Sequence, residues 1–330
     1  MSITTTATAA GDRTEPVGHA DIVGTGTGRS VEAGVRMGFF TDTSVCIGCK
    51  ACEVACKEWN DLESIVGDLT GQSYDNTGAL TADNWRHVTF IEKVEGRGGS
   101  RRADGDGPHP LAPPAPSREP EAPASPGDVT LPTPMLAPDG PASVVWLMSS
   151  DVCKHCTHAA CLDVCPTGSL VKTEFDTVVV QPDICNGCGY CVPACPFGVI
   201  GRDESTGGAA KCTLCYDRLK GDQTPACAHA CPTDSIQFGP LDELRERAGD
   251  RLVELGDAGE GRARLYGEDP EDGIGGAGAF FLLLDEPDVY GLPPAPVATT
   301  RDLPGMWRTA AATAVGLVVT VGALFLGSGS

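Results

Sequence analysis

Aromatic and basic residues are scarce in this chain of 330 residues. Aromatics make up 5% of it, and 24 Lys and Arg face 45 Asp and Glu, which leaves a formal net charge of −21. So few basic side chains cannot form the positive stripe that neutralises phosphates, and this excludes a nucleic-acid partner. With 42 Gly and 26 Pro, the composition predicts a loop-rich chain long enough for two small domains.

Motifs of independent catalysis are also lacking. The sequence holds no Ser/His/Asp set, no Walker loop, and no flavin or nicotinamide fingerprint placed between a strand and a helix. The glycines at 24–28 (GTGTG) have no strand before them and no helix pattern after them, so we interpret them as flexible chain. Residues 1–36 show neither the apolar core of a signal peptide nor a twin-arginine pair, and we expect a disordered leader. No catalytic residue is predicted.

Cysteine, by contrast, is abundant, with sixteen residues in four runs of four and none left over. Run three, CNGCGYCVPACP from Cys185, fits C-x2-C-x2-C-x3-C-P, in which three cysteines hold one iron-sulfur cluster and the fourth reaches a neighbouring one. Run one, from Cys46, keeps this spacing with Lys57 in place of the proline. Runs two and four, from Cys153 and Cys212, lengthen the second gap. The repeat predicts four [4Fe-4S] clusters and therefore an electron carrier.

Two other chemistries use cysteine in similar numbers. Disulfides suit a small secreted chain, but these C-x2-C spacings come without a secretory signal. Zinc also takes four-cysteine sites, yet a proline directly after the fourth cysteine of such a run is typical of clusters. We therefore interpret the thiols as cluster ligands.

The pairing of the runs follows from the way in which the fourth cysteine crosses to a neighbouring cluster. Runs two and three lie 19 residues apart, a suitable distance for one ferredoxin-like unit, which leaves runs one and four for each other. Each expected set binds the iron of one cluster. The sets are A, Cys46, Cys49, Cys52 and Cys231; B, Cys56, Cys212, Cys215 and Cys227; C, Cys153, Cys156, Cys161 and Cys195; and D, Cys165, Cys185, Cys188 and Cys191.

The expected fold class is α+β, with two ferredoxin-like double-cluster units and one C-terminal transmembrane helix. Apolar patterns predict strands through Phe39 and Phe40 and over 88–94, 143–148, 177–181 and 279–284. Apolar residues at helical spacing predict an amphipathic helix over 241–255. The expected organisation is a leader (1–36), an outer unit of runs one and four (37–95 and 200–285), an insertion (96–142), an inner unit of runs two and three (143–199), a connector (286–305) and the membrane helix (306–327).

The insertion carries twelve prolines between Gly96 and Pro141. Such a composition buries too little apolar surface to offset the entropy of ordering, and it predicts an unstructured loop. A partner-docking arm is the alternative, because long loops inside domains are sometimes functional.

Residues 309–326 form a stretch of eighteen positions without a charge. As a helix it would be about 27 Å long, close to the roughly 30 Å of a bilayer core, with Trp307 and Arg308 at the interface. Ala312 and Gly316 would allow close packing on a membrane partner. A buried soluble helix stays open, because Thr, Ala and Gly dilute the hydrophobicity. Arg301 and Arg308 lie before the stretch and no basic residue follows it, which favours a cytoplasmic cluster domain.

Other side chains within the runs are candidates for tuning the clusters. Histidines could donate hydrogen bonds to cluster sulfur, and lysines could stabilise the more negative reduced state. Surface histidines and solvated lysines are the alternatives. The candidates are His155, His158, His229, Lys50, Lys57, Lys154 and Lys211.

Several motifs together resemble the iron-sulfur β subunit of membrane-bound respiratory formate dehydrogenase of the N/O type. They are CIGCKACEVACKEWND, NGCGYCVPACPFG, KCTLCYDRLKGDQTPACAHACPT, LYGEDP with GIGG, and YGLPPAP before the terminal apolar stretch. The likeness covers residues 37–95 and 143–326, and the insertion and the leader depart from it. Polysulfide, dimethyl sulfoxide and nitrate reductases share the cysteine pattern, so the terminal helix and its connector are what favour formate dehydrogenase.

The resemblance implies a division of labour in a complex anchored in the cell membrane. A molybdenum or tungsten pterin α subunit would oxidise formate, this chain would relay the electrons through four [4Fe-4S] clusters, and a cytochrome b γ subunit would reduce quinone. The resemblance also implies the opposite membrane face, through export together with the α subunit. The same role in another pterin oxidoreductase is the alternative. A membrane-tethered iron-sulfur sensor is a third, although four complete cysteine sets favour conduction.

Overall fold

Short strands and short helices alternate along the part of the chain that the computed structural model describes, residues 34–63, 74–75, 77–94, 100–102 and 144–327. The helices are α1 (Ala51–Asn60), α2 (Ala160–Asp163), α3 (Cys191–Ala194), α4 (Tyr216–Lys220), α5 (Ala226–His229), α6 (Leu241–Asp257) and α7 (Leu303–Gly327), with 3-10 turns η2 (Thr43–Val45) and η3 (Pro287–Tyr290). The strands are β1 (Met37–Asp42), β2 (Arg86–Val94), β3 (Ser100–Arg102), β4 (Val144–Val152), β5 (Leu170–Lys172), β6 (Val178–Val180), β7 (Gly201–Arg202), β8 (Ala209–Ala210), β9 (Ile236–Pro240), β10 (Arg264–Tyr266) and β11 (Ala279–Leu283).

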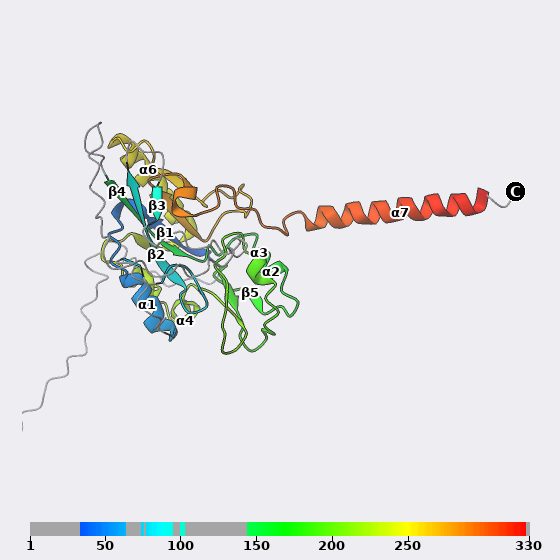
Figure 1. Ribbon diagram of the computed structural model, residues 1–330, viewed down its shortest axis with the longest axis horizontal. Coiled ribbons are helices and arrows are strands. Elements are labelled where there is room, and N and C mark those ends of the chain that lie inside the picture. Colours follow the sequence, from blue (N-terminus) through cyan, green and yellow to red (C-terminus); the bar gives the residue numbers. More distant parts are fainter. Residues whose placement is uncertain (1–33, 64–73, 76, 95–99, 103–143, 328–330) are drawn as a thin grey trace, which may run out of the picture. The chain divides into compact units, whose positions relative to one another are not determined.

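A four-stranded sheet in the order β10-β11-β1-β9 holds the two ends of the cysteine region together (Figure 1). β1 runs parallel to β11 and antiparallel to β9, and both β1 and β11 are buried along their whole length. A Cβ at Gly38 would lie 2.3 Å from the carbonyl oxygen of Gly278, so glycine is required where β1 passes the start of β11. The expected strands through Phe39 and Phe40 and over 279–284 are confirmed.

Helix α6 packs on this sheet through the apolar face that its sequence predicts. Leu241, Leu244, Ala248 and Leu255 are all buried, and they recur with the three-to-four-residue spacing of one helix face. The helix is longer than expected by two residues at its C-terminal end. Its first turn follows β9 directly, and the Leu241 amide donates to the carbonyl of Arg36.

A second sheet, β3-β2-β4, is antiparallel throughout. The strands expected over 88–94 and 143–148 are confirmed as β2 and β4, each of which is longer than its apolar pattern. The expectation that the whole insertion from Gly96 is unstructured is wrong at one point, because 100–102 forms β3 against β2. Backbone hydrogen bonds to a free strand edge need no apolar composition. The rest of the insertion, 103–142, lies outside the described residues.

The short helices that carry the cysteines meet in pairs that are distant in sequence. α1 of run one packs on α5 of run four, and α2 of run two packs on α3 of run three. The two-stranded sheets β5-β6 and β7-β8 flank runs two and three, and β6 confirms the strand expected over 177–181. The tertiary fold therefore brings together the runs that the spacing pairs.

The expected leader and the expected membrane helix both differ from the observed structure at their boundaries. Residues 1–33 of the expected leader lie outside the described residues, but Arg36 does not belong to a disordered leader, since it contacts Asp176 at 3.2 Å and Thr157 at 2.7 Å.

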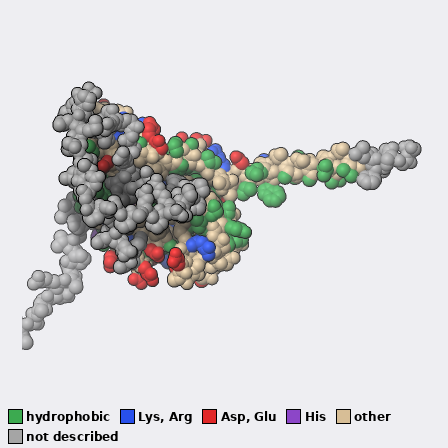
Figure 2. Space-filling model, in the orientation of Figure 1, with side chains coloured by type: hydrophobic (Ala, Val, Ile, Leu, Met, Phe, Trp, Pro, Cys, Tyr) green, Lys and Arg blue, Asp and Glu red, His purple; other side chains and the backbone are tan. Residues whose placement is uncertain are grey.

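The connector contains η3, and α7 begins at Leu303, three residues before the expected membrane helix. Figure 2 shows hydrophobic side chains along α7. No helix in the described part of the chain is both long and apolar enough to span a membrane.

Candidate iron-sulfur centres

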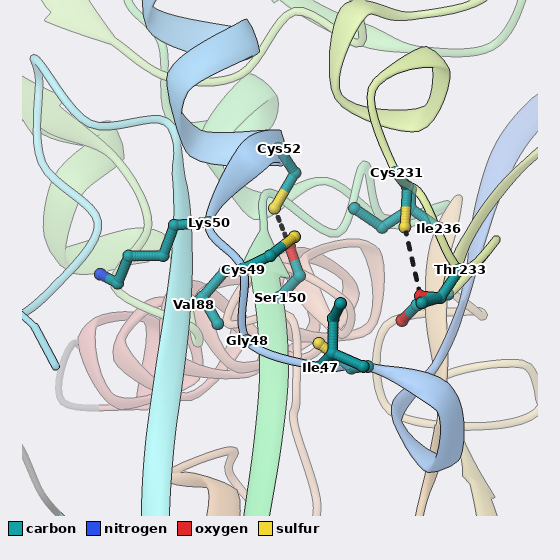
Figure 3. A pocket seen from close by; sticks show the side chains of 12 residues that line it. Ile47, Gly48, Cys49, Lys50, Cys52, Val88, Ser150, Cys231, Thr233 and Ile236 are labelled. Carbon is teal, nitrogen blue, oxygen red and sulfur yellow. Dashed lines mark hydrogen bonds between the residues drawn. The ribbon is translucent and has the colours of Figure 1, made fainter.

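The four cysteines of set A line one small pocket (Figure 3). Cys46, Cys49 and Cys52 come from the loop before α1 and its first turn, and Cys231 follows α5. The Oγ of Ser150 on β4 lies 3.2 Å from the Sγ of Cys52, and the Oγ of Thr233 lies 3.9 Å from the Sγ of Cys231. The set thus joins the two ends of the cysteine region, with hydroxyls that can donate to its sulfurs.

The loop of run one follows the strand β2 closely. Gly48 has φ +66°, and a Cβ there would lie 2.6 Å from the Phe90 ring, so both the backbone conformation and the space require glycine. Lys50 closes the loop at φ 60°, next to the start of α1. This tight turn is what aims three thiols from seven consecutive residues into one cavity.

The four cysteines of set C line a second small pocket. Cys153, Cys156 and Cys161 belong to run two, whereas Cys195 comes from the end of α3 in run three. Val178, Val199 and Ile200 supply apolar wall, and Lys154 and His155 are its buried polar lining.

All four cysteines of set B are buried. Burial, and after it the neighbouring Cys212, Cys227 and Cys215, raise the pKa of the Cys56 thiol, so these four sulfurs interact with one another. Cys56 stands on α1, one helical turn from Cys52, and it therefore turns toward the cysteines of run four rather than those of its own loop.

Set D, like set A, contains one exposed, one buried and two partly buried cysteines. Cys188 is exposed, and Cys191 interacts with Cys185, Cys165 and Cys188. Burial acts to raise the pKa of Cys165, but hydrogen bonds from Ser169, Leu170 and Thr167 outweigh it and lower that pKa to about 6. Cys165 is therefore largely thiolate at neutral pH.

The donor chemistry of the four sets fits iron-sulfur clusters. All sixteen thiols are free, and thiolates are the ligands that such clusters take. Burial raises the pKa of Cys52, Cys161 and Cys212 to about 12, so these thiols must release protons when iron binds. Within the described residues, no group of three or more His, Cys, Asp or Glu side chains is arranged to hold a metal ion. In a [4Fe-4S] cubane, each thiolate binds a different iron atom. The four thiolates therefore need not converge on one point, as the ligands of a single metal ion do.

The sets are also neighbours of one another in a fixed order. Cys52 of set A interacts with Cys227 of set B, Cys212 of set B with Cys153 of set C, and Cys161 of set C with Cys191 of set D. An exposed cysteine occurs only in the first and last sets of this series, Cys49 in A and Cys188 in D. The sixteen cysteines thus follow one another in the order A-B-C-D, with an exposed cysteine at each end and none in the two middle sets.

The candidate tuning residues divide into buried and exposed ones. His155 and Lys154 are buried beside set C, and Lys211 is buried next to Cys212. His158 and His229 are exposed. Lys50 forms an ion pair with Asp75 at 2.7 Å, and Figure 3 shows its side chain pointing away from the sulfurs of Cys49 and Cys52. Lys57 donates a hydrogen bond to the carbonyl of Asp83.

Arg86 was not among the sequence-predicted residues. It has no exposed surface, and it interacts with cysteines of sets A and B. Strand alternation does not identify it, because β2 is buried on both faces, with Val88 and Phe90 on the face of Arg86 and His87, Thr89 and Ile91 on the other.

The fold and the cysteine sets define a protein of the 4Fe-4S dicluster class. A 4Fe-4S dicluster domain model matches residues 45–169, and a second one matches residues 144–241. Two such domains and sixteen cysteines fit four [4Fe-4S] clusters.

Similarity to individual proteins narrows the class. The chain is 33% identical over 288 residues to the formate dehydrogenase-O iron-sulfur subunit of Escherichia coli, which covers 86% of this chain and 79% of that protein. It is 33% identical over 266 residues to the formate dehydrogenase iron-sulfur subunit of Haemophilus influenzae, covering 79% and 70%. The B subunit of the anaerobic dimethyl sulfoxide reductase of Escherichia coli is 33% identical over 215 residues, covering 65% and 78%. The chain belongs to the family of formate dehydrogenase iron-sulfur subunits, and it is an electron-transfer subunit of an oxidoreductase complex.

Proposed function

We propose that the chain relays electrons from a formate-oxidising molybdenum or tungsten pterin subunit to a quinone-reducing cytochrome subunit. The observation that supports this role most strongly is the array A-B-C-D with accessible cysteines at both ends. A carrier needs one end open to its electron donor and the other open to its acceptor. A sensor, by comparison, needs only one accessible cluster.

The chain's own residues divide the work. A [4Fe-4S] cluster accepts and releases one electron at a time. Each set supplies four thiolates, with sets A and B joining runs one and four and sets C and D joining runs two and three. The buried cysteines of set B exclude water from the middle of the array, while Cys49 and Cys188 bring its ends to the surface.

Contacts beside α7 support a direction for the relay. Thr300 donates a hydrogen bond to Asp163 of α2, and Ala298 packs with Ala160 and Ala194, which lie on the helices of runs two and three. The chain enters α7 at Leu303, only three residues beyond Thr300. If α7 anchors the protein, sets C and D lie at the membrane end, so we assign set A to the catalytic subunit and set D to the cytochrome subunit.

Membrane attachment through α7 is part of the same proposal. Its support is the charge-free stretch 309–326 and the exposure of Val315, Leu317, Val318 and Val319, each above 60%. Arg301 and Arg308 before this stretch favour a cytoplasmic cluster domain by the positive-inside rule. Export with a signal-bearing catalytic subunit would place it on the opposite face.

Formate is favoured over other substrates because the similarity to a formate dehydrogenase subunit extends over a larger share of this chain. The formate dehydrogenase-O subunit matches 86% of this chain, whereas the B subunit of dimethyl sulfoxide reductase matches 65%. The second candidate is therefore the same relay in a dimethyl sulfoxide reductase or another pterin oxidoreductase, including the polysulfide and nitrate types.

Formate-dependent bleaching tests the proposal. The complex is purified anaerobically through a tag on this chain, and the broad visible iron-sulfur absorbance is recorded before and after formate is added. We expect formate to bleach the band as dithionite does. Bleaching by dithionite alone, with a pterin subunit present in the complex, would assign the relay to another oxidoreductase.

A further inference from the structure

Arg86 is a fully buried cation for which the described residues offer no carboxylate partner. Its Nη1 donates to the Oγ of Ser150 at 3.0 Å and to the Ser150 carbonyl at 3.3 Å. Its Nε and Nη2 are buried and have no hydrogen-bond partner among the described residues. The guanidinium lies 4.9 Å above the Phe39 ring, on β1 of the other sheet. The positive charge thus lies between the two sheets, and no Asp or Glu among the described residues neutralises it.

Such an arrangement needs a compensating negative charge. A buried unpaired ion destabilises the folded state, and the guanidinium cannot avoid this penalty by losing its proton. Arg86 interacts with Cys52 of set A and with Cys227, Cys212 and Cys56 of set B. Thiolates that hold a cluster carry the negative charge that the acidic side chains do not supply. Arg86 therefore lies at the junction between sets A and B.

Lys211 repeats the pattern one junction further along. It is 1% exposed, and its Nζ donates to the carbonyls of Val178 and Cys212, the latter at 2.8 Å. No carboxylate among the described residues forms an ion pair with it. Its charge acts on Cys161 of set C and on Cys212 of set B. Lys154 differs, because Asp151 pairs with it.

We infer that Arg86 and Lys211 are fixed counter-ions of the cluster array, Arg86 shared by sets A and B and Lys211 shared by sets B and C. Each stabilises the reduced, more negative state of the two clusters that it adjoins. Each also weakens the repulsion between electrons held on neighbouring sets, because it lies at the junction. Set D has neither cation. The inference rests on the four-cluster assignment and not on formate as the substrate.

Potentiometric titration of the purified complex tests this inference. Dithionite and mediators replace formate, and electron paramagnetic resonance follows the reduced clusters in the wild type, Arg86→Met and Lys211→Met. We expect two midpoint potentials to fall in each variant, each by at least the equivalent of a tenfold change in the reduction equilibrium, about 59 mV for one electron. The potential of set B should fall in both Arg86→Met and Lys211→Met. The potential of set D should fall in neither variant.

Three controls separate charge from shape. Arg86→Lys retains the charge and should keep the wild-type potentials, and Arg264→Met removes an exposed cation that already pairs with Glu286 and should change none. Iron and sulfide content reports assembly in every variant. Loss of clusters in Arg86→Met together with full loading in Arg86→Lys would still support a charge requirement.

Other results would overturn the inference. Unchanged potentials in both methionine variants, equal shifts of all four clusters, or cluster loss in Arg86→Lys as severe as in Arg86→Met would each show that these side chains act only through packing. A wild-type complex without four reducible clusters would instead refute the cluster assignment itself.

Discussion

The backbone amide of Val178 donates a hydrogen bond to the Nδ1 of His155 at 3.0 Å. An Nδ1 that accepts carries no proton, so the proton of this imidazole is on Nε2. That Nε2 is buried and has no partner among the described residues, and His155 lines the cavity of set C. The strand β6 therefore orients a hydrogen-bond donor beside one cluster.

Replacement of His155 should change one cluster potential and no other. A hydrogen bond to cluster sulfur stabilises the reduced state, so His155→Phe should lower the potential of set C by the equivalent of about 1 kcal/mol. The measurement is a potentiometric titration followed by electron paramagnetic resonance. His158→Phe, at an exposed histidine of the same run, is the matched control and should leave all four potentials unchanged. An equal shift in both variants would contradict a role for Nε2.

Double substitutions test which cysteines bind the same cluster. Cys46 and Cys231 line one cavity, whereas Cys56 of the same run as Cys46 interacts with Cys212 and Cys227. A cubane left with two thiolates should be lost, so Cys46→Ser with Cys231→Ser should remove one cluster. Cys46→Ser with Cys56→Ser should damage two. Iron and sulfide analysis with Mössbauer spectroscopy counts the clusters, and the reverse result would assign each run to its own cluster.

Removal of α7 should release the protein from membranes. The described side chains from Leu303 to Val321 are exposed, so no packing in the described residues depends on them. A chain ending at Pro304, expressed without its partners, should move from the membrane fraction to the soluble fraction with its iron content unchanged. The full-length chain expressed in the same way is the control. Equal recovery of both chains in the membrane fraction would rule out α7 as the anchor.

The ion pair between Lys93 and Asp285 predicts a pH-dependent stability. Burial acts to raise the pKa of Asp285, but the hydrogen bond from Lys93 and the backbone amide of Glu286 outweigh it, and the pKa lies below its usual value. A carboxylate of this kind stabilises the fold above its unfolded pKa of about 4, and the contribution is lost as the pH falls through the folded pKa.

The test of this pair is Asp285→Asn. At pH 7 we expect it to cost about 1 kcal/mol and to lower the thermal unfolding midpoint by a few degrees, with the difference narrowing only below about pH 4, as the pH falls through the folded pKa. Glu286→Gln is the matched control, because the pair of Glu286 with Arg264 is exposed and should contribute little. A difference between Asp285→Asn and the wild type that stays constant as the pH falls from 7 to well below 4 would show that charge is not its source.

The longer elements could be predicted from sequence because their patterns are periodic. Alternation identified β2 and β4, and the helical repeat from Leu241 to Leu255 identified α6. The strand β3 and the two-residue strands β7 and β8 are too short to show a period. β3 forms because an edge of β2 is free, whereas, within the described residues, β7 and β8 pair only with each other. The composition of residues 1–36 does not reveal that Arg36 is ordered, because its contacts with Asp176 and Thr157 join residues far apart in sequence.

The sequence by itself determined the chemistry of this protein, because the spacing of cysteines within a run is local and permits only certain metal centres. The same spacing indicated the cofactor and the number of clusters, and the motifs around it indicated the family. Only the tertiary structure decided the order A-B-C-D, the accessible ends, and the positions of Arg86, Lys211 and His155 beside the sets. Those features depend on which strands and loops are packed together, and a buried cation cannot be told from a solvated one until that packing is known.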